Sequence, residues 1–325
     1  MKSPSQSNSS FLRTLGVCIG ASTIGIAAVE RKIDAGGDGQ VHTRVTRNGC
    51  YPHGGDPKKV LQSVLQEIQA HRYDRIAATG RKFRHFVNLS SISEPEAVEH
   101  AYRFTRQPGV NCPAVVSAGG ETFMVYVLDA SDQIANVITG NKCASGTGEF
   151  FLQQLRRMDV SLEEAARWTA SEDPYHVSGR CSVFCKSDCT HATNKGIPRA
   201  KVTAGLCKMM ADKILELLKK VERRNIMIVG GTTRNVMMID YLEKKIPGLR
   251  IPPEAAYFEA LGAALWALDH KTRAFPKPSG LFVTDRASFE TLPPLKDARE
   301  LVSFKSIRGV DIEANDTAII GLDVG

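Results

Sequence analysis

The chain has 325 residues, of which 42% are hydrophobic and 24% are charged, and its formal net charge is +7. This composition is that of an ordinary globular protein, and the length allows two lobes that each have a core. The modest positive charge comes without a nucleic-acid-binding signature, and no apolar run is long enough to span a membrane. We therefore expect a cytoplasmic protein that has neither nucleic acid nor a membrane as its partner.

The N-terminal half is predicted to mix strands and helices after a Ser-rich, disordered tail over 1–13. In chain order, the predicted elements are strand, turn and strand over 14–30, a helix over 56–71, a strand over 75–80, a helix over 94–105, and strands over 112–120 and 122–129. In the first helix, Val60, Val64, Leu65 and Ile68 recur on one face, which is the pattern of an amphipathic helix.

The C-terminal half is predicted to be mostly helical. Its predicted elements are helices over 146–158, 161–170 and 199–224, a buried strand over 226–231, and a small-residue helix over 257–270. Ser161 is the expected N-cap of the second of these helices, and Glu164 completes a capping box. The Pro-rich stretch 275–315 is expected to be irregular and to act as a linker or connector.

Any phosphate site in this chain is expected to use hairpin turns. The sequence contains no Walker A motif, and no Gly-x-Gly-x-x-Gly opens a helix after a strand. It does contain two strand–turn–strand units with glycine in the turn, one near residue 20 and one near residue 119. Each glycine taken alone could belong to an ordinary turn.

The eight cysteines are expected to be thiols, metal ligands or core residues rather than disulfides, because no secretory signal is found. They are Cys18, Cys50, Cys112, Cys143, Cys181, Cys185, Cys189 and Cys207.

Two segments carry the cysteines with the clearest chemical context. In NKCASGTGEFF (141–151), Cys143 directly precedes a helix start, where N–H groups favour a thiolate; a small buried cysteine beside a turn is the alternative. In GRCSVFCKSDCTH (179–191), cysteines at i, i+4 and i+8 would share one helix face, as ligands or as packing residues. One iron–sulfur cluster needs about four thiolates. The chain offers no tight set of four, so a symmetric dimer that donates two per subunit is a natural way to complete one.

These two segments, followed by IMIVGGTTRN (226–235) and EALGAAL (259–265), resemble the ATP-dependent activators of 2-hydroxyacyl-CoA dehydratases and benzoyl-CoA reductases, the BadF/BadG/BcrA/BcrD ATPase family. The resemblance covers residues 14–270. It implies an α/β fold of two RNase H-like lobes, of the actin, hexokinase and heat-shock-70 ATPase type, that close on ATP or ADP with Mg²⁺. It also implies a homodimer with one [4Fe-4S] cluster at the subunit interface. The implied partner is an acyl-CoA dehydratase or reductase component that receives the electron.

The resemblance assigns roles to individual residues. Cys143 and Cys181 become the cluster ligands of each subunit, whereas Cys185 and Cys189 have no counterpart and are interpreted mainly as core thiols. The nucleotide contacts come from three motifs that contain glycine. They are Gly20, Ser22 and Thr23 in the first hairpin, Gly119, Gly120 and Glu121 in the second, and Gly230, Gly231 and Asn235 in the adenosine-side loop.

The resemblance also divides the chain. From the N-terminus, its parts are the tail (1–13), a first RNase H-like lobe (14–112), a second with the cysteine motifs (113–256), a helix returning to the first lobe (257–272), a linker (273–315) and the start of a second activase domain (316–325). The last part depends on GLDVG (321–325), which repeats the family's first hairpin motif with its aspartate, Asp323. The sequence therefore predicts the N-terminal piece of a long, duplicated member, in which this half pairs with itself or with the second half.

Two replacements predict slow ATP hydrolysis by this half. In the family each hairpin carries an aspartate near Mg²⁺, and here Cys18 and Ser117 stand in those places. A thiol and a hydroxyl are poor substitutes for carboxylates beside a hard cation. A non-hydrolysing scaffold half and a sugar kinase of the same superfamily are therefore kept as alternatives to an electron-transferring activase.

Overall fold

A computed structural model describes residues 10–33, 42–81, 83–140, 146–168, 173–283, 299–303 and 305. The chain divides into two compact units, Met1–Thr284 and Asp285–Gly325. In the second unit the described residues include one short turn of helix at 299–301. The predicted start of a further domain at 316–325, including Asp323, lies outside the described residues. All the features that follow belong to the first unit.

A five-stranded sheet forms the N-terminal part of this unit, with strand order β3-β2-β1-β4-β5. Its strands are β1 (Ser10–Ile19), β2 (Thr23–Ile33), β3 (Thr43–Pro52), β4 (Arg75–Thr79) and β5 (Ser90–Ser91). Alternate residues of a strand point to opposite faces, so Leu15, Val17 and Ile19 share one face of β1. They pack there in a buried cluster with Leu61 and Leu65, from the helix α1 (Pro57–Glu67).

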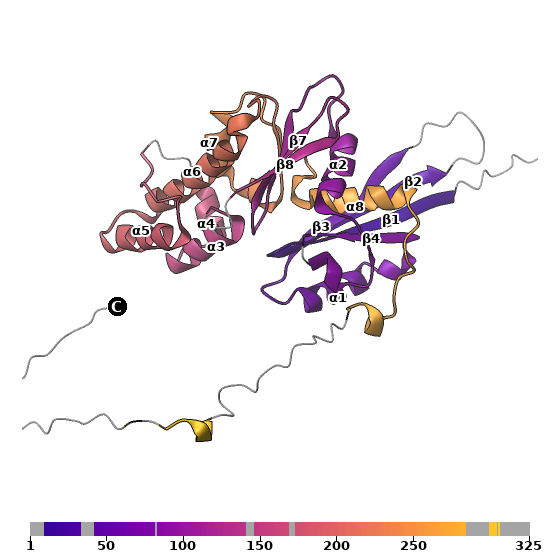
Figure 1. Ribbon diagram of the computed structural model, residues 1–325, viewed down its shortest axis with the longest axis horizontal. Coiled ribbons are helices and arrows are strands. Elements are labelled where there is room, and N and C mark those ends of the chain that lie inside the picture. The colour runs from indigo at the N-terminus through magenta and orange to yellow at the C-terminus, as the bar shows by residue number, and fades with distance from the viewer. Residues whose placement is uncertain are drawn as a thin grey trace, which may run out of the picture. The chain divides into compact units, whose positions relative to one another are not determined.

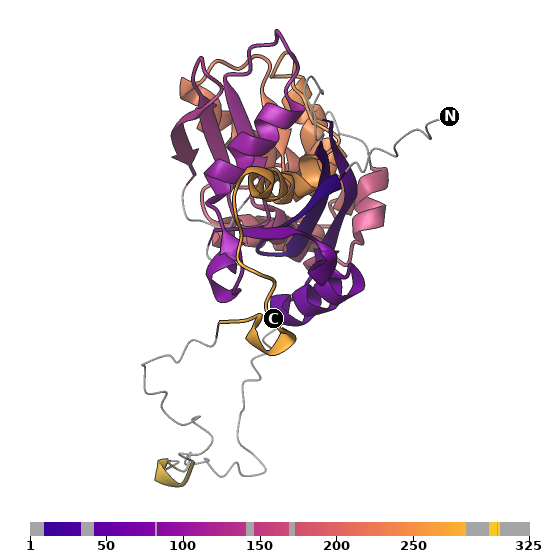
Figure 2. The same ribbon diagram turned by 90° about the vertical axis from the view of Figure 1, so that its right-hand side faces the viewer.

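The opposite face of this sheet is covered by helix α8 (Phe258–Asp269), with α2 (Glu94–Thr105) beside it (Figures 1 and 2). Here the backbones touch almost directly. A Cβ atom added at Gly16 of β1 would lie 1.9 Å from the carbonyl oxygen of Ala260, and one added at Gly262 of α8 would lie 1.7 Å from that of Ala97 in α2. Glycine at both positions therefore lets α8 lie between the sheet and α2 at backbone contact distance.

A four-stranded sheet, with strand order β8-β7-β6-β9, forms the second part. Its strands are β6 (Ala114–Ala118), β7 (Phe123–Leu128), β8 (Ile134–Thr139) and β9 (Met227–Val229). Val115, Tyr126 and Met227 of this sheet share a buried cluster with residues of α2 and α8. The two sheets are thus packed through these two helices.

Helices from the C-terminal half cover the other face of the second sheet (Figure 1). They are α3 (Gly148–Arg157), α4 (Leu162–Arg167), α5 (Ser182–Asn194), α6 (Arg199–Leu217) and α7 (Val236–Glu243). Short 3₁₀ turns occur at Ala70–Arg72, Phe83–Phe86, Leu218–Lys220, Gly231–Arg234, Ala255–Tyr257 and Pro278–Gly280. As predicted, the Ser161 side chain caps α4 by accepting from the amide of Glu164.

Two expectations about the chain's ends differ from the structure. The strand β1 already begins at Ser10, because its pairing with β2 continues to Ser10 opposite Ile33, so the tail is shorter than predicted. The predicted linker (273–315) also differs from the structure, because its first residues, up to Val283, pack against the first sheet. Leu281 is buried against the α1 face of the first sheet, and the amide of Val283 donates to the carbonyl of Phe86 at 2.9 Å.

Candidate functional site

A large cavity of about 1110 Å³ opens where the two hairpins β1–β2 and β6–β7 meet α3, α7 and α8. All nine residues predicted to contact a nucleotide line it. They are Gly20, Ser22, Thr23, Gly119, Gly120, Glu121, Gly230, Gly231 and Asn235. Three motifs that are up to about 210 residues apart in sequence are thus brought to one place.

The first hairpin turn is held by local hydrogen bonds and reaches across to the second sheet's elements. The amide of Gly20 donates to the carbonyl of Thr23 at 3.0 Å. The Ser22 hydroxyl donates to Glu149 Oε2, in the first turn of α3, at 2.9 Å. A Cβ atom added at Gly120 would lie 2.6 Å from Ser22 Oγ. The tips of the two hairpins therefore touch, and glycine at position 120 permits that approach.

The second hairpin turn is fixed by the start of α3. The amide of Gly148 donates to the carbonyl of Gly119 at 3.2 Å, and the amide of Glu149 donates to that of Gly120 at 3.0 Å. The Thr232 hydroxyl also donates to the Gly119 carbonyl, at 3.2 Å. These amides of the α3 N-terminus serve to hold the hairpin, so they are not free to bind an anion.

The third motif wraps around the end of β6. Gly230 has a φ of 99° and a Cβ atom there would lie 2.5 Å from the carbonyl oxygen of Ala118, so only glycine fits without strain. Asn235 caps α7, because its Oδ1 accepts from the amide of Met238 at 3.0 Å. Its side chain also exchanges a hydrogen bond with the Cys207 thiol at 3.3 Å. Asn235 therefore has a structural role besides its position in the cavity wall.

The floor of the cavity contains two carboxylates that the sequence analysis did not assign. Glu259, in the first turn of α8, accepts a hydrogen bond from the Ser117 hydroxyl at 2.8 Å. Glu94, at the start of α2, accepts from the Tyr126 hydroxyl at 2.9 Å and from Arg81 Nε at 3.3 Å. Both carboxylates are more than nine-tenths buried. The signal that could have indicated Glu259 is an acidic residue in the first turn of a helix, directly before the apolar run 260–268.

The electrostatics of the floor favour neutral groups. Burial raises the pKa of Glu259 to about 7, and the neighbouring Glu94 charge adds to the rise. Desolvation also raises the pKa of the Cys18 thiol well above its ordinary value, with further increases from Glu259 and Glu94. Cys18 is therefore a neutral thiol at neutral pH, as expected for a residue that cannot replace a carboxylate.

The lining of the cavity also has large apolar side chains. They include Phe151, Leu162, Trp168 and Val236. Leu162 and Val236 are among the most exposed large apolar side chains of the described residues, at 52% and 60%. Exposed apolar side chains that gather at a cavity favour a flat, apolar ligand group.

The cysteines fall into different environments. Cys181 is half-buried and forms the N-cap position of α5. Cys185 and Cys189 are 0% and 2% exposed and pack in the core beneath α6, which confirms their interpretation as core thiols. The hydrogen bond between them, together with burial, raises the pKa of Cys185. Cys143 lies outside the described residues.

The flanks of the two cysteine motifs meet at α6. A Cβ atom at Gly146 would lie 2.5 Å from the side chain of Lys213 and 3.2 Å from that of Met209. A Cβ atom at Gly179 would lie 3.2 Å from Met209. Gly146 is three residues from Cys143 along the chain and Gly179 two from Cys181. Within the described part of the chain, no three His, Cys, Asp or Glu side chains form a metal-binding group.

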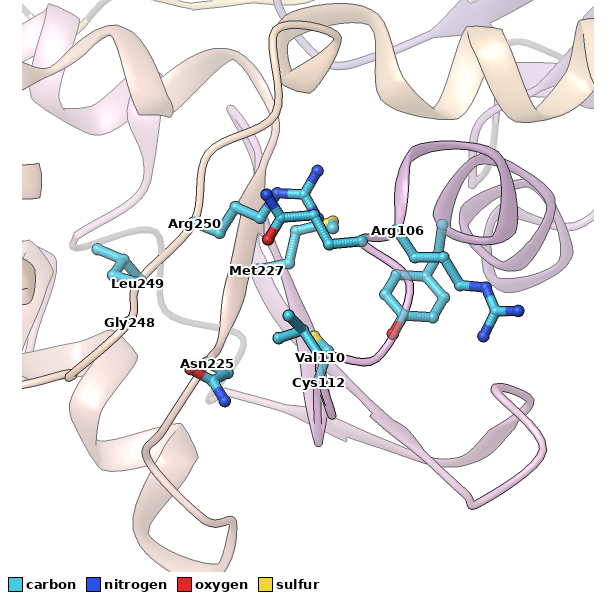
Figure 3. Close-up of a pocket in the computed structure, with 10 residues that line it drawn as sticks. Arg106, Val110, Cys112, Asn225, Met227, Gly248, Leu249 and Arg250 are labelled. Atoms are coloured by element: carbon cyan, nitrogen blue, oxygen red, sulfur yellow. The ribbon is translucent and has the colours of Figure 1, made fainter.

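A smaller cavity of about 280 Å³ lies at the C-terminal end of α2 (Figure 3). Its two guanidinium groups already have partners. Arg250 Nη2 donates to the carbonyl of Thr105 at 2.7 Å and so caps α2, while Arg106 is paired with Asp132. No predicted site residue lines this cavity, and we interpret it as part of the packing between α2 and β9.

Comparison with known proteins gives a family match. Residues 77–267 match the model of the BadF/BadG/BcrA/BcrD ATPase family. The chain is 28% identical over 158 residues to the 2-hydroxyisocaproyl-CoA dehydratase activator of Clostridioides difficile, covering 48% of this chain and 59% of the relative. It is 28% identical over 160 residues to the (R)-2-hydroxyglutaryl-CoA dehydratase activating ATPase of Acidaminococcus fermentans, covering 48% and 61%. The aligned part thus spans about three fifths of each of these two relatives.

The fold is similar to that of a solved activator. The structure of the activator of the 2-hydroxyisocaproyl-CoA dehydratase from Clostridium difficile, with bound ADPNP, has a TM-score of 0.66 and 23% sequence identity, covering 79% of this chain and 94% of that one. The expected class, two RNase H-like lobes of the actin, hexokinase and heat-shock-70 type, is therefore confirmed. In the described part of the chain, no helix has both the length and the apolarity needed to cross a membrane.

Proposed function

Because the chain belongs to the BadF/BadG/BcrA/BcrD ATPase family, we propose that it is a nucleotide-dependent activator module that delivers electrons to an acyl-CoA dehydratase or reductase component. The observation that carries the proposal is the convergence of all three glycine-containing motifs on one cavity. The names of the related activators supply the class of partner.

The walls of the cavity suit the two ends of an adenine nucleotide. The hairpin turns at Gly20 and Gly119–Gly120 offer backbone that a phosphate chain can approach closely. Arg81, Arg156 and Arg234 also line the cavity and offset negative charge. The apolar part of the lining, which includes Trp168, suits the base. ATP or ADP with Mg²⁺ would therefore lie with its phosphates between the hairpins.

A titration with ADP and with a non-hydrolysable ATP analogue, in the presence of Mg²⁺, tests this part. Gly120→Ala introduces a Cβ atom 2.6 Å from Ser22 Oγ and is expected to weaken binding at least tenfold. Gly140→Ala is the matched control, because its Cβ atom would meet its nearest neighbour, in Leu217, at an ordinary 3.7 Å. Absence of nucleotide binding by the unaltered chain would refute the proposed function.

We also propose that Cys143 and Cys181 are the ligands of a [4Fe-4S] cluster shared by two copies of the chain. Support comes from the flanks of both motifs, which pack against Met209 of α6. Cys181 is accessible at a helix N-terminus, where backbone amides favour an anionic group. A cluster bound there would supply one-electron transfer at low potential.

Anaerobic purification with iron and sulfide quantification tests the cluster. We expect about four iron atoms per two chains, lost in Cys143→Ala and in Cys181→Ala. Cys50→Ala and Cys207→Ala are the controls, since neither thiol belongs to the two motifs. A protein that holds no iron, or one complete cluster in each monomer, would contradict this assignment.

A non-hydrolysing scaffold half is the second candidate function, favoured by Cys18 and Ser117 at the hairpin positions that would otherwise carry carboxylates. It would bind nucleotide without turnover. A sugar kinase of the same superfamily would instead lack iron and leave both cysteine motifs without a role. Phosphate release separates the first alternative from an active module, and iron content separates the second.

A further inference from the structure

Neither hairpin strand carries a carboxylate at the position before its turn, but the carboxylate of Glu259, from α8, lies beside these positions. Cys18 and Ser117 each lie two residues before the turn glycine of their hairpin, on β1 and β6. Glu259 is placed against both. Its carboxylate accepts from Ser117 Oγ at 2.8 Å, and its charge raises the pKa of the Cys18 thiol. The space freed by two short side chains is thus occupied by a longer acid from another element.

The backbone of α8 fixes the position of Glu259. The next residue, Ala260, presses its carbonyl against Gly16 of β1, and Ala260 Cβ would lie 3.7 Å from a Cβ atom at Gly25 of β2. The backbone of Glu259 is therefore held close to the hairpin strands, and the hydrogen bond from Ser117 orients its carboxylate. Its side chain lines the same cavity as Gly20, Gly119 and Gly120.

The second acid of the floor has a different role. Both oxygens of Glu94 are engaged, by Tyr126 and by Arg81. Among the described residues, Ser117 is the side chain that donates to Glu259. Glu259 can therefore still accept a proton or a hydrogen bond from the cavity.

We propose that Glu259 is the carboxylate that orients and deprotonates the water attacking the terminal phosphate of a nucleotide bound in this cavity. The inference rests on the proposed nucleotide site. In the step, the water oxygen bonds to the γ-phosphorus and the bond from that phosphorus to the β–γ bridging oxygen breaks. The electron pair of that bond leaves with ADP. The water proton passes to Glu259 and then to solvent, so the products are ADP and phosphate.

Several ionisable groups surround Glu259 and define its pH dependence. From the neighbouring elements they are Glu94, Arg81, Cys18, Cys50 and Tyr126. Glu94 opposes the ionisation of Glu259, and Arg81 favours it. The thiols and the phenol are neutral near pH 7, because desolvation raises the pKa of each.

The test measures nucleotide binding and phosphate release separately on the full chain. Glu259→Gln preserves size and can still accept from Ser117. It is expected to lower the rate of phosphate release about 10²-fold, while the affinity for ADPNP changes less than threefold. Glu254→Gln is the matched control, because it makes the same change five residues away, outside the cavity lining.

A relocated carboxylate gives a second readout. The double variant Ser117→Asp, Glu259→Gln exchanges the two hydrogen-bonding partners and returns an acid to the hairpin strand. It is expected to release phosphate at least ten times faster than the single variant Glu259→Gln. The pH profile of kcat/KM should rise to a plateau through about pH 7 in the unaltered chain and lose that step in Glu259→Gln.

The outcomes separate the two proposals. If ADPNP binds and Glu259→Gln releases phosphate as fast as the unaltered chain, the role of Glu259 is refuted and the nucleotide site stands. The same holds if ADPNP binds and no phosphate is released, which would favour the scaffold function. If ADPNP does not bind at all, the proposed function fails and this inference with it.

Discussion

Replacing Glu259 by glutamine should change how the stability of the protein depends on pH. The folded protein holds the Glu259 proton up to about pH 7, because burial raises the pKa above its ordinary value of 4.5. The unfolded chain releases that proton near the ordinary value. The folded state therefore binds more protons between these two pH values, and its free energy of unfolding falls as the pH rises through this window.

The size of the effect follows from the two pKa values. The difference between about 7 and 4.5 corresponds to about 3 kcal/mol, at about 1.36 kcal/mol per pKa unit. Glutamine does not titrate, so Glu259→Gln escapes this loss. The free energy of unfolding of the variant minus that of the unaltered chain should therefore increase by about 3 kcal/mol as the pH is raised from 4 to 8.

The assay is urea unfolding followed by far-ultraviolet circular dichroism at several pH values, with Glu254→Gln as the control. Comparing variants at each pH cancels the titration of groups that all of them share. A stability difference between Glu259→Gln and the unaltered chain that stays constant within about 0.5 kcal/mol over this range would refute the reasoning. It would mean that the carboxylate is solvated or permanently charged in the folded protein.

Four further predictions concern the same region. Gly262→Ala should destabilise the protein by about 3 kcal/mol or prevent folding, because its Cβ atom would lie 1.7 Å from a carbonyl oxygen of α2. Gly231→Ala, with no atom within 4 Å of its Cβ atom, should have little effect on the denaturant midpoint. Ser22→Ala removes the hydrogen bond to the α3 carboxylate and should cost about 1 kcal/mol in the same assay. Arg81→Gln removes a cation that lowers the pKa of Glu259, so the midpoint of the pH–rate profile should move to higher pH; an unchanged midpoint would contradict this.

The sequence predicts the helices with strong local signals well. The helix α2 occupies the predicted range 94–105, where Ser93 caps its first turn and Pro95 lies at its start. The prediction for 56–71 was too long, since α1 ends at Glu67 and a separate 3₁₀ turn follows. Such ends are set by tertiary contacts rather than by the apolar pattern.

Elements at the periphery were harder to predict. The strand β3 (Thr43–Pro52) was missed, because it is an edge strand whose charged residues, such as Arg44 and Arg47, resemble a loop. The helix α7 was also missed, although Asn235 at its N-cap was a usable signal. β3 lacks the buried apolar face that sequence patterns reveal, whereas α7 buries Met237, Met238, Ile239 and Leu242 and is short, at eight residues.

The candidate site was predictable in its glycine turns and not in the two buried acids of its floor. The turn motifs are local, and each was visible in the sequence. The position of Glu259 beside Ser117 depends on two residues 142 apart in the chain. No local pattern indicates that a helix start near the C-terminus lies against a hairpin strand. The sequence shows that positions 18 and 117 carry no aspartate. That Glu259 lies in their place is seen only in the three-dimensional structure.

The backbone contacts of α8 also have a mechanical consequence. With no side chain at Gly16 or Gly262 to act as a compliant layer, the first sheet, α8 and α2 should move as a rigid block. Any opening of the cavity must then bend the chain where it crosses between the sheets. One such connection runs from the end of α2, at Thr105, to β6. Arg250, in the segment that leads back from β9 to α8, donates a hydrogen bond to the Thr105 carbonyl there. That arginine would therefore hold the hinge at the C-terminal end of α2.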